Sequence, residues 1–190
     1  MTTAIAILAA GNSTRLGRPK QLVSWRGTSL LQHAVDTACA VAPRVLLTLG
    51  ADADALWHSL HAPLSLQRID VPDHGDGLSA SLRAAVSCAE SDPAVARLLV
   101  MLVDQYAVDA HWLRSLLALA GQHPQRMVAS RYDSVRGVPA VFPRDAFAAL
   151  AALRGDQGAR ALLRDEPDPI DHPAPHPPGD VDTPGQMPPA

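Results

Sequence analysis

The chain has 190 residues, of which 47% are hydrophobic and 18% charged, a balance typical of a globular domain with a substantial apolar core. A net charge of -3 without any basic run argues against a partner that is a nucleic acid. No apolar stretch reaches the roughly 18 residues that span a bilayer. The N-terminal Met1–Ala4 also lacks the basic start of a signal peptide, so we expect no membrane partner and a cytoplasmic location.

Strands and helices are expected to alternate along the chain. The first apolar run, at 4–8, is typical of a strand buried on both faces of a parallel sheet. Further strands are expected at 45–49, 66–71, 98–103, 127–130 and 139–142, and helices at 28–41, 52–60, 78–90, 110–120, 144–150 and 158–163. The run at 98–103 is the most apolar and is predicted to be the central strand. This alternation predicts an α/β fold with three layers and a mostly parallel sheet.

The composition changes near Glu166. From there the chain is rich in proline and shows no periodic pattern, which predicts an irregular segment. We therefore expect one domain at 1–166, with a Pro-rich segment at 167–190 packed on it.

The loop that follows the first strand has features of a phosphate-binding loop. It runs from Leu8 to Lys20 and has the pattern L-A-A-G-x-S-x-R-x-G-x-x-K. Two glycines let the backbone approach a ligand and turn its N–H groups towards phosphate oxygens. The spacing excludes a Walker A loop, in which Lys directly follows the second Gly, and the G-x-G-x-x-G dinucleotide fingerprint.

Two cations stand in this loop, Arg15 and Lys20. Together they can neutralise a triphosphate and later a departing pyrophosphate; the alternative is a tight turn with two solvated cations. Lys20 is the only lysine among 16 basic residues, in a chain that uses arginine everywhere else. A compact ammonium and a planar guanidinium suit different phosphate geometries, which favours a specific role for Lys20.

Asp104 directly follows the apolar run at 98–103, so it is expected at the carboxyl end of that strand. In open α/β sheets, ligands bind at this edge, where the strand order reverses. If the first strand is its neighbour, Asp104 faces the phosphate loop. A carboxylate there is a natural Mg²⁺ ligand, although a helix cap or turn would also suit an aspartate.

Six segments, in order, resemble those of nucleotidyltransferases related to the molybdenum-cofactor cytidylyltransferase, the MobA-like NTP transferases. The guanylyl-transferring enzymes of that cofactor are cousins. The segments are the L-A-A-G loop, G-L-S-A-S-L-R-A-A-V at 77–86, L-V-D-Q at 102–105, G-V-P-A-V-F at 137–142, L-R-G-D-Q-G-A-R-A-L-L at 153–163 and D-V-D-T-P at 180–184. The resemblance implies a Rossmann-like nucleotidyltransferase fold.

The resemblance also implies roles for individual residues. Arg15, Lys20 and Asp104 are expected to be catalytic, and Asp104 and Asp182 to bind Mg²⁺, with Asp180 a substitute for Asp182. The expected nucleotide-binding residues are Leu8, Ala9, Ala10, Gly11, Arg15, Lys20, Gly77, Ser79 and Ser81. Ser79 can alternatively cap the helix that follows it. The segments at 137–139 and 155–160 belong to the half that would face the second substrate.

Two departures from the family pattern are apparent: Tyr106 replaces the usual Pro after D-Q, and Gly185-Gln186 replaces an acidic pair. The implied reaction is transfer of CMP from CTP to the phosphate of molybdenum–molybdopterin, with release of pyrophosphate. A molybdenum hydroxylase or its chaperone would receive the product. The alternatives are transfer to a sugar or alcohol phosphate, a non-catalytic carrier of the finished cofactor and, more remotely, a reductase on the same fold.

Overall fold

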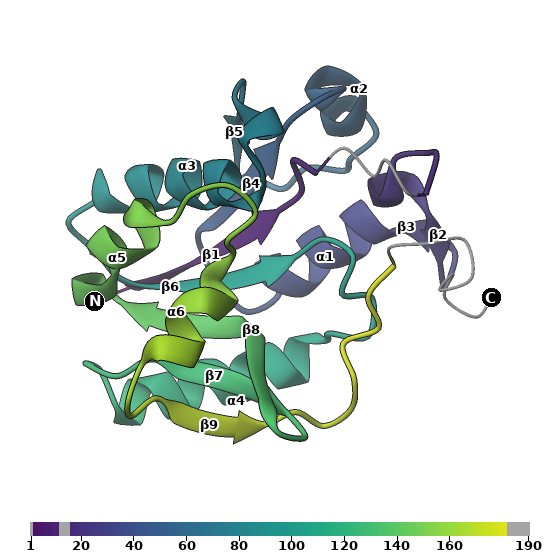
Figure 1. Cartoon of the computed structure of the whole chain (residues 1–190). Coiled ribbons are helices and arrows are strands. Elements are labelled where there is room, and N and C mark those ends of the chain that lie inside the picture. The colour runs from purple at the N-terminus through teal and green to yellow at the C-terminus, as the bar shows by residue number, and fades with distance from the viewer. Residues whose placement is uncertain (1, 12–15, 182–190) are drawn as a thin grey trace.

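The computed structural model describes residues 2–11 and 16–181 (Figure 1). Seven strands form one sheet in the order β5-β4-β1-β6-β8-β7-β9. They are β1 Thr2–Leu8, β4 Val45–Leu49, β5 Leu66–Asp70, β6 Val95–Leu102, β7 Val128–Tyr132, β8 Val135–Pro143 and β9 Ile170–Pro173. The α-helices are α1 Leu30–Cys39, α2 Ala53–His58, α3 Leu78–Glu90, α4 Ala110–Gln122, α5 Phe147–Ala152 and α6 Ala159–Asp165.

Alternate residues of the central strands face two separate cores. Ile5 and Ile7 of β1 pack with α1 and α4 on one face, whereas Ala4, Ala6 and Leu8 pack with α3, α5 and α6 on the other. Because side chains alternate along a strand, a strand covered by helices on both faces must be apolar throughout, as β1 is. The three-layer α/β fold expected from the sequence is confirmed, and β6 is the middle strand of the seven.

The strand order reverses next to β1. The chain runs from β1 outward to β4 and β5, then returns through α3 to β6 on the other side of β1, and all three strands are parallel to β1. The carboxyl ends of β1 and β6 therefore lie side by side, with Leu8 paired to Leu102. Such a switch point leaves a crevice at the sheet edge. β8 runs antiparallel to both β6 and β7, so the sheet is mostly, not wholly, parallel.

Two small sheet elements differ from the sequence expectation. Ser24–Trp25 and Thr28–Ser29 form a short hairpin, β2 and β3, so α1 begins at Leu30, where the Ser29 hydroxyl accepts a hydrogen bond from the N–H of Gln32. The Pro-rich segment is not wholly irregular, because β9 pairs with β7 at the sheet edge. Proline is tolerated on an edge strand, which explains why composition concealed β9.

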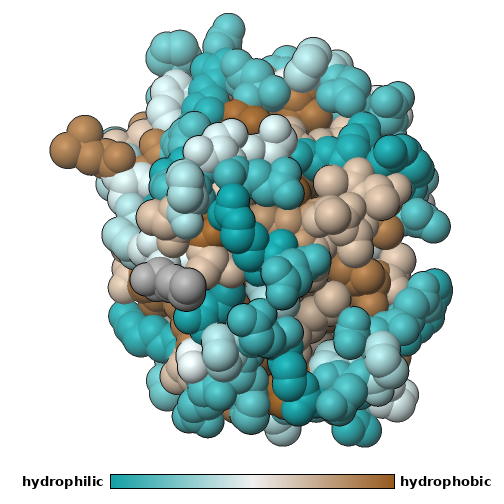
Figure 2. Space-filling view, turned by 90° about the vertical axis from the view of Figure 1, so that its left-hand side faces the viewer, coloured by the Kyte–Doolittle hydropathy of each residue, from teal (hydrophilic) through white to brown (hydrophobic). Residues whose placement is uncertain are grey.

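On the face shown in Figure 2, hydrophilic residues are interspersed with smaller hydrophobic patches. Within the described ranges, every helix is too short or too polar to cross a membrane.

Candidate functional site

The site lies at the crevice between the carboxyl ends of β1 and β6. The N–H of Val103 donates to the carbonyl of Leu8 at 3.2 Å, which ties the two strand ends together. Asp104 is the next residue and is buried, with 5% of its surface exposed. From the sequence, Asp104 was predicted to face the loop after β1 if the two strands are neighbours. The structure shows β1 and β6 paired in the sheet.

Lys20 meets Asp104 across this crevice. The ammonium of Lys20 lies 2.6 Å from Oδ2 of Asp104, and the two side chains are only 17% and 7% exposed. Taking both charges out of water is costly, and the close contact offsets that cost. The two residues are 84 positions apart in the sequence, and the fold brings them into contact. The site thus combines an ammonium group, which suits phosphate oxygens, with a carboxylate, which suits a metal ion.

The ion pair with Lys20 changes the expected effect of a substitution at Asp104 on the stability of the metal-free protein. Two carboxylates without metal would repel each other, so the loss of one should not destabilise the metal-free protein. Asp104, however, already has a cationic partner in Lys20. Its replacement is therefore expected to remove a favourable contact, whether or not the carboxylate also binds a metal ion.

Gln21 braces the start of the loop. Its side-chain Nε2 donates to the carbonyls of Ala9 and Gly11, at 2.7 Å and 3.2 Å, and the residue is only 3% exposed. Its Oε1 is buried and has no hydrogen-bond partner among the residues that the structure describes. Gln21 thus fixes the backbone just after β1, with its carbonyl oxygen left as an acceptor. The sequence interpretation missed Gln21, because its contacts with Ala9 and Gly11 become apparent only in the fold.

A cavity of about 250 Å³ occupies the crevice. Its walls include Lys20, Gln21 and Asp104, together with Leu8, Ala10, Gly11, Leu78, Leu102, Val103 and Asp180. Four expected nucleotide-binding residues, Leu8, Ala10, Gly11 and Lys20, therefore line one cavity. Leu78, the first residue of α3, was not predicted as part of the site.

The carboxylates of Asp104 and Asp180 line the same cavity. This donor set fits a divalent cation, because Mg²⁺ is commonly held by one or two carboxylates plus substrate phosphates. Two of the predicted residues, Arg15 and Asp182, lie outside the described residues.

The two serines in the first turn of α3, Ser79 and Ser81, follow the cavity-lining Leu78 but are buried. Ser79 is fully buried, and its hydroxyl accepts a hydrogen bond of 3.0 Å from Arg83. Ser81 is 3% exposed. Neither is among the residues that line the cavities described here, so their expected contact with a nucleotide remains a prediction.

Gly77 precedes α3 with φ of 88°, a conformation that side chains disfavour. A Cβ at this position would lie 2.5 Å from a carboxylate oxygen of Asp156, and the N–H of Ser79 donates to the carbonyl of Gly155. Gly77 therefore allows the start of α3 to pack closely against the loop before α6.

Tyr106 holds the segment that carries Asp180. Its ring lies 4.8 Å from that of Trp25 in β2, and Gly179, with φ of 73°, packs so closely that an added Cβ would lie 2.5 Å from the Tyr106 ring. The N–H of Ala107 donates to the carbonyl of Pro178. Tyr106 thus replaces the rigidity of proline with aromatic packing.

Gln105 and Tyr132 shape the crevice on the β8 side. Gln105 accepts from the N–H of Leu102 and donates to the carbonyl of Val138, which also accepts from the Tyr132 hydroxyl at 2.6 Å. Burial is the main cause that raises the pKa of Tyr132, so its hydroxyl stays protonated and acts as a donor at neutral pH. Both side chains line a second, mostly apolar cavity of about 530 Å³.

Comparisons with known proteins agree with this geometry. The nicotine blue oxidoreductase of Paenarthrobacter nicotinovorans is 34% identical over 172 residues, 85% of this chain and 81% of that one. A probable molybdenum cofactor guanylyltransferase of Opitutus terrae is 31% identical over 163 residues, 84% and 75% of the two chains. The structure of Rv0371c from Mycobacterium tuberculosis in complex with manganese has a TM-score of 0.79 and 31% identity, covering 98% of this chain and 96% of that one.

The family model for the MobA-like NTP transferase domain matches residues 5–171. The matched range includes Lys20, Asp104, all of β4 to β8 and most of β1, and so contains every residue that lines the crevice cavity except Asp180. The chain therefore belongs to the family of MobA-like NTP transferase domains and is a nucleotidyltransferase.

Proposed function

We propose that the chain transfers CMP from CTP to the terminal phosphate of molybdenum–molybdopterin and releases pyrophosphate. The observation that carries this proposal is the Lys20–Asp104 pair at the switch point between β1 and β6. A buried cation and carboxylate beside a glycine-containing loop suit the binding of a nucleoside triphosphate.

In the proposed reaction, an oxygen of the acceptor phosphate attacks the α-phosphorus of CTP in line. The new P–O bond forms as the bond to the β-phosphate oxygen breaks, and pyrophosphate leaves with that electron pair. Lys20 neutralises charge on the triphosphate, and Gln21 holds the loop at the end of β1 in place. Positioning and charge neutralisation can carry such a transfer without a covalent enzyme intermediate.

Asp104 and Asp180 would hold Mg²⁺, with Asp182 the further ligand that the sequence suggests. When bound, the ion supplies positive charge that stabilises the phosphate oxygens. The manganese complex of Rv0371c supports a divalent metal in this fold, so an assay should compare the two ions.

Release of pyrophosphate, measured with each NTP, with and without the molybdenum cofactor, tests this function. We expect turnover with CTP that depends on the cofactor and on Mg²⁺, and CTP should outcompete GTP. Preference for CTP rests on the resemblance of residues 77–86 to cytidylyltransferases, whereas the relative from Opitutus terrae is named for guanylyl transfer. Equal use of both, or cofactor-independent turnover with a sugar phosphate, would contradict the proposal.

A non-catalytic or redox role is the second candidate, because the relative with 34% identity is named an oxidoreductase. Binding of the molybdenum cofactor without pyrophosphate release from any NTP would favour a carrier. In the transferase proposal, the enzyme acts in the cytoplasm and passes its product to a molybdenum hydroxylase or its chaperone.

A further inference from the structure

The start of α3 packs directly against the loop at 153–158, which joins α5 to α6. A Cβ on Gly77 would lie 2.6 Å from the backbone of Gly155, and the N–H of Ser79 donates to the carbonyl of Gly155 at 3.1 Å. Between these two residues, Leu78 packs on Gly158, where an added Cβ would lie 2.7 Å from the Leu78 side chain. Residues 77–79 and the α5–α6 loop are therefore in close backbone contact.

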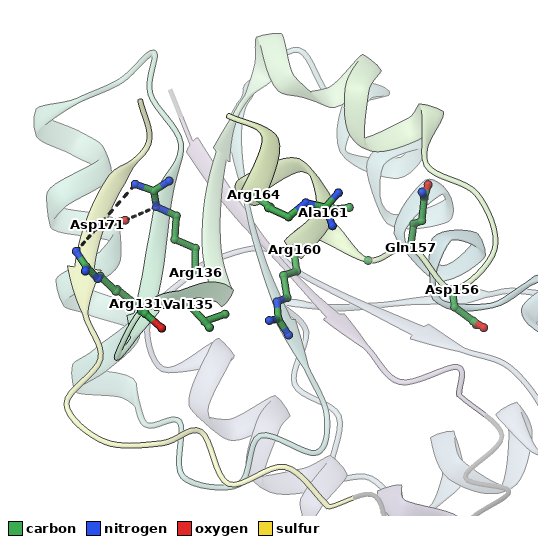
Figure 3. Close-up of a pocket in the computed structure, with 11 residues that line it drawn as sticks. Arg131, Val135, Arg136, Asp156, Gln157, Arg160, Ala161, Arg164 and Asp171 are labelled. Atoms are coloured by element: carbon green, nitrogen blue, oxygen red, sulfur yellow. Dashed lines mark hydrogen bonds and ion pairs between the residues drawn. The ribbon is translucent and has the colours of Figure 1, made fainter. Parts of the chain in front are cut away.

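This contact sets the position of residues that line several cavities. Leu78 lines both the crevice cavity and the mostly apolar cavity of about 530 Å³. Asp156, in the α5–α6 loop, lines the apolar cavity and a larger one of about 910 Å³. Figure 3 shows Asp156 at the opposite side of the larger cavity from Asp171. A shift of α3 against the loop would therefore change the walls of these cavities.

Arg83, one turn along α3 from Ser79, fastens the contact. Its Nη1 donates to the Ser79 hydroxyl at 3.0 Å and lies 3.4 Å from the carbonyl of Leu153, and its Nη2 donates to Oδ2 of Asp73 at 3.2 Å. Only about a quarter of the Arg83 side chain is exposed. One guanidinium thus joins the segment before α3, the first turn of α3 and the α5–α6 loop, which its planar fork of donors allows.

Arg83 also lines a cavity of about 420 Å³, so a role in binding an anion has to be weighed. The charged residues that line this cavity are Arg83, Arg154, Asp76 and Asp156. Two arginines and two aspartates cancel in formal charge, so they do not favour an anion. The contacts of Arg83 with three protein acceptors favour a role in holding the segments together.

We propose that Arg83 is a positioning residue for the nucleoside triphosphate. It does not line the crevice cavity, and it acts by keeping Leu78 in the place that the bound nucleotide needs. Without Arg83, only a fraction of the molecules has this wall in place before binding, and the apparent affinity falls in proportion to that fraction. The inference needs only the nucleotidyltransferase family of the chain, so it holds for either base and for any acceptor.

Calorimetric titration of the whole chain with Mg²⁺–CTP and with Mg²⁺–GTP, without an acceptor, tests this role. We expect Arg83→Gln to raise the Kd of the nucleotide that the wild type binds more tightly about tenfold, because a charged donor to three acceptors is lost. Arg83→Lys should recover part of this loss, since an ammonium can contact Asp73 but cannot span all three acceptors. An unchanged Kd in Arg83→Gln would overturn the proposal.

Arg144→Gln is the matched control. Arg144 also donates to three acceptors, the carbonyls of Glu90, Asp92 and Val95, and it lines none of the four cavities described above. We expect this variant to have a lower melting temperature but a Kd within about twofold of the wild type. A similar rise in Kd in both variants would overturn the proposal, because Arg83 would then act only through overall stability.

Amide hydrogen exchange at Ser79 measures the contact without any ligand. The N–H of Ser79 is bonded to the carbonyl of Gly155, so Arg83→Gln should speed its exchange about tenfold, and Arg144→Gln much less. Faster exchange together with an unchanged Kd would show that Arg83 has a structural role only. Unchanged exchange would show that Arg83 does not hold the contact, and would refute the proposal as well.

Discussion

The fold holds the side chain of Lys20 in a defined position. Its ammonium is mostly buried against Asp104, so its position is set before a substrate arrives. We expect Lys20→Ala to lower turnover about 10²-fold or more, because it removes charge stabilisation at the departing phosphates. Lys20→Arg should recover only part of this loss, since a planar guanidinium cannot fill the place of a compact ammonium.

Steady-state rates of pyrophosphate release check this prediction. Arg18→Ala is a suitable control, because Arg18 belongs to the same loop but does not line the crevice cavity. Full activity of Lys20→Arg would mean that any cation suffices at this position. Unchanged turnover of Lys20→Ala would remove Lys20 from the site.

Gly179 is a second residue at which a substitution has a defined expected effect, here on local stability. Its φ of 73° and its close contact with the Tyr106 ring both oppose a side chain. We expect Gly179→Ala to destabilise the packing of residues 178–181 by about 1–3 kcal/mol. Amide hydrogen exchange at Ala107 measures this directly, because its N–H is bonded to the carbonyl of Pro178.

Gly121, in contrast, is a glycine at which alanine is expected to stabilise the protein. It lies in α4, its φ is not positive, and an added Cβ would have no atom within 4 Å outside the neighbouring helix backbone. Gly121→Ala should therefore raise the free energy of unfolding by up to about 1 kcal/mol, measured by denaturant titration. Equal and small effects of the two substitutions would contradict the packing of Tyr106 on Gly179.

Among the elements, β9 is attached to the sheet edge by ion pairs as well as by its pairing with β7. Asp171 of β9 is hydrogen-bonded to Arg136 of β8 and contacts Arg131 of β7. The hydrogen bond from Arg136 is the main cause that lowers the pKa of Asp171 from its ordinary value. The folded state therefore favours the ionised carboxylate.

The pH dependence of stability follows from that direction. A lowered pKa contributes stability above the unfolded value of about 3.9, and this stability is lost as the pH falls through the folded value. Asp171→Asn should thus be less stable than the wild type at pH 7. The difference should stay constant down to about pH 5 and shrink towards pH 3 in thermal unfolding. Asp168→Asn, at a more exposed pair, should show a smaller difference. A constant difference across this range would refute the role of the charge.

The elements also show what the sequence could and could not predict. Strand β4 and helix α3 were predicted with the observed bounds, because their apolar patterns end at Gly50 and begin after Gly77. The hairpin β2–β3 and the edge strand β9 were missed. They are short and are stabilised by partners far away in sequence, such as Val128 for Ile170, so local periodicity contains no signal for them.

The same distinction holds for the site. Lys20 and Asp104 were identifiable because each has a chemical signal, a lone lysine and a carboxylate at a strand end. Gln21 and Leu78 were missed, since their importance arises from contacts with Ala9 and with the walls of the crevice. The cavity lined by Arg131, Arg136, Arg160 and Arg164 likewise exists only once β7, β8, β9 and α6 are assembled.

At the scale of the whole molecule, the proposed metal site should link metal binding to the stability of the fold, and Asp104 is the residue at which to test this link. Asp104→Asn removes both the proposed metal ligand and the ion pair with Lys20, so the melting temperature without ligand should fall modestly. Mg²⁺ with CTP should raise the melting temperature of the wild type, since a ligand that binds only the folded state stabilises it according to its affinity. We expect Asp104→Asn to lose most of this rise and most of its turnover. Asp109 caps α4 and does not line the crevice cavity, and asparagine also caps helices well, so Asp109→Asn should change the stability little and keep the full rise with Mg²⁺ and CTP. If Asp104→Asn kept the full rise and full activity, the metal site would be wrong. If it lost only the rise in the presence of Mg²⁺, with CTP alone unaffected, Asp104 would act through the metal and not through Lys20.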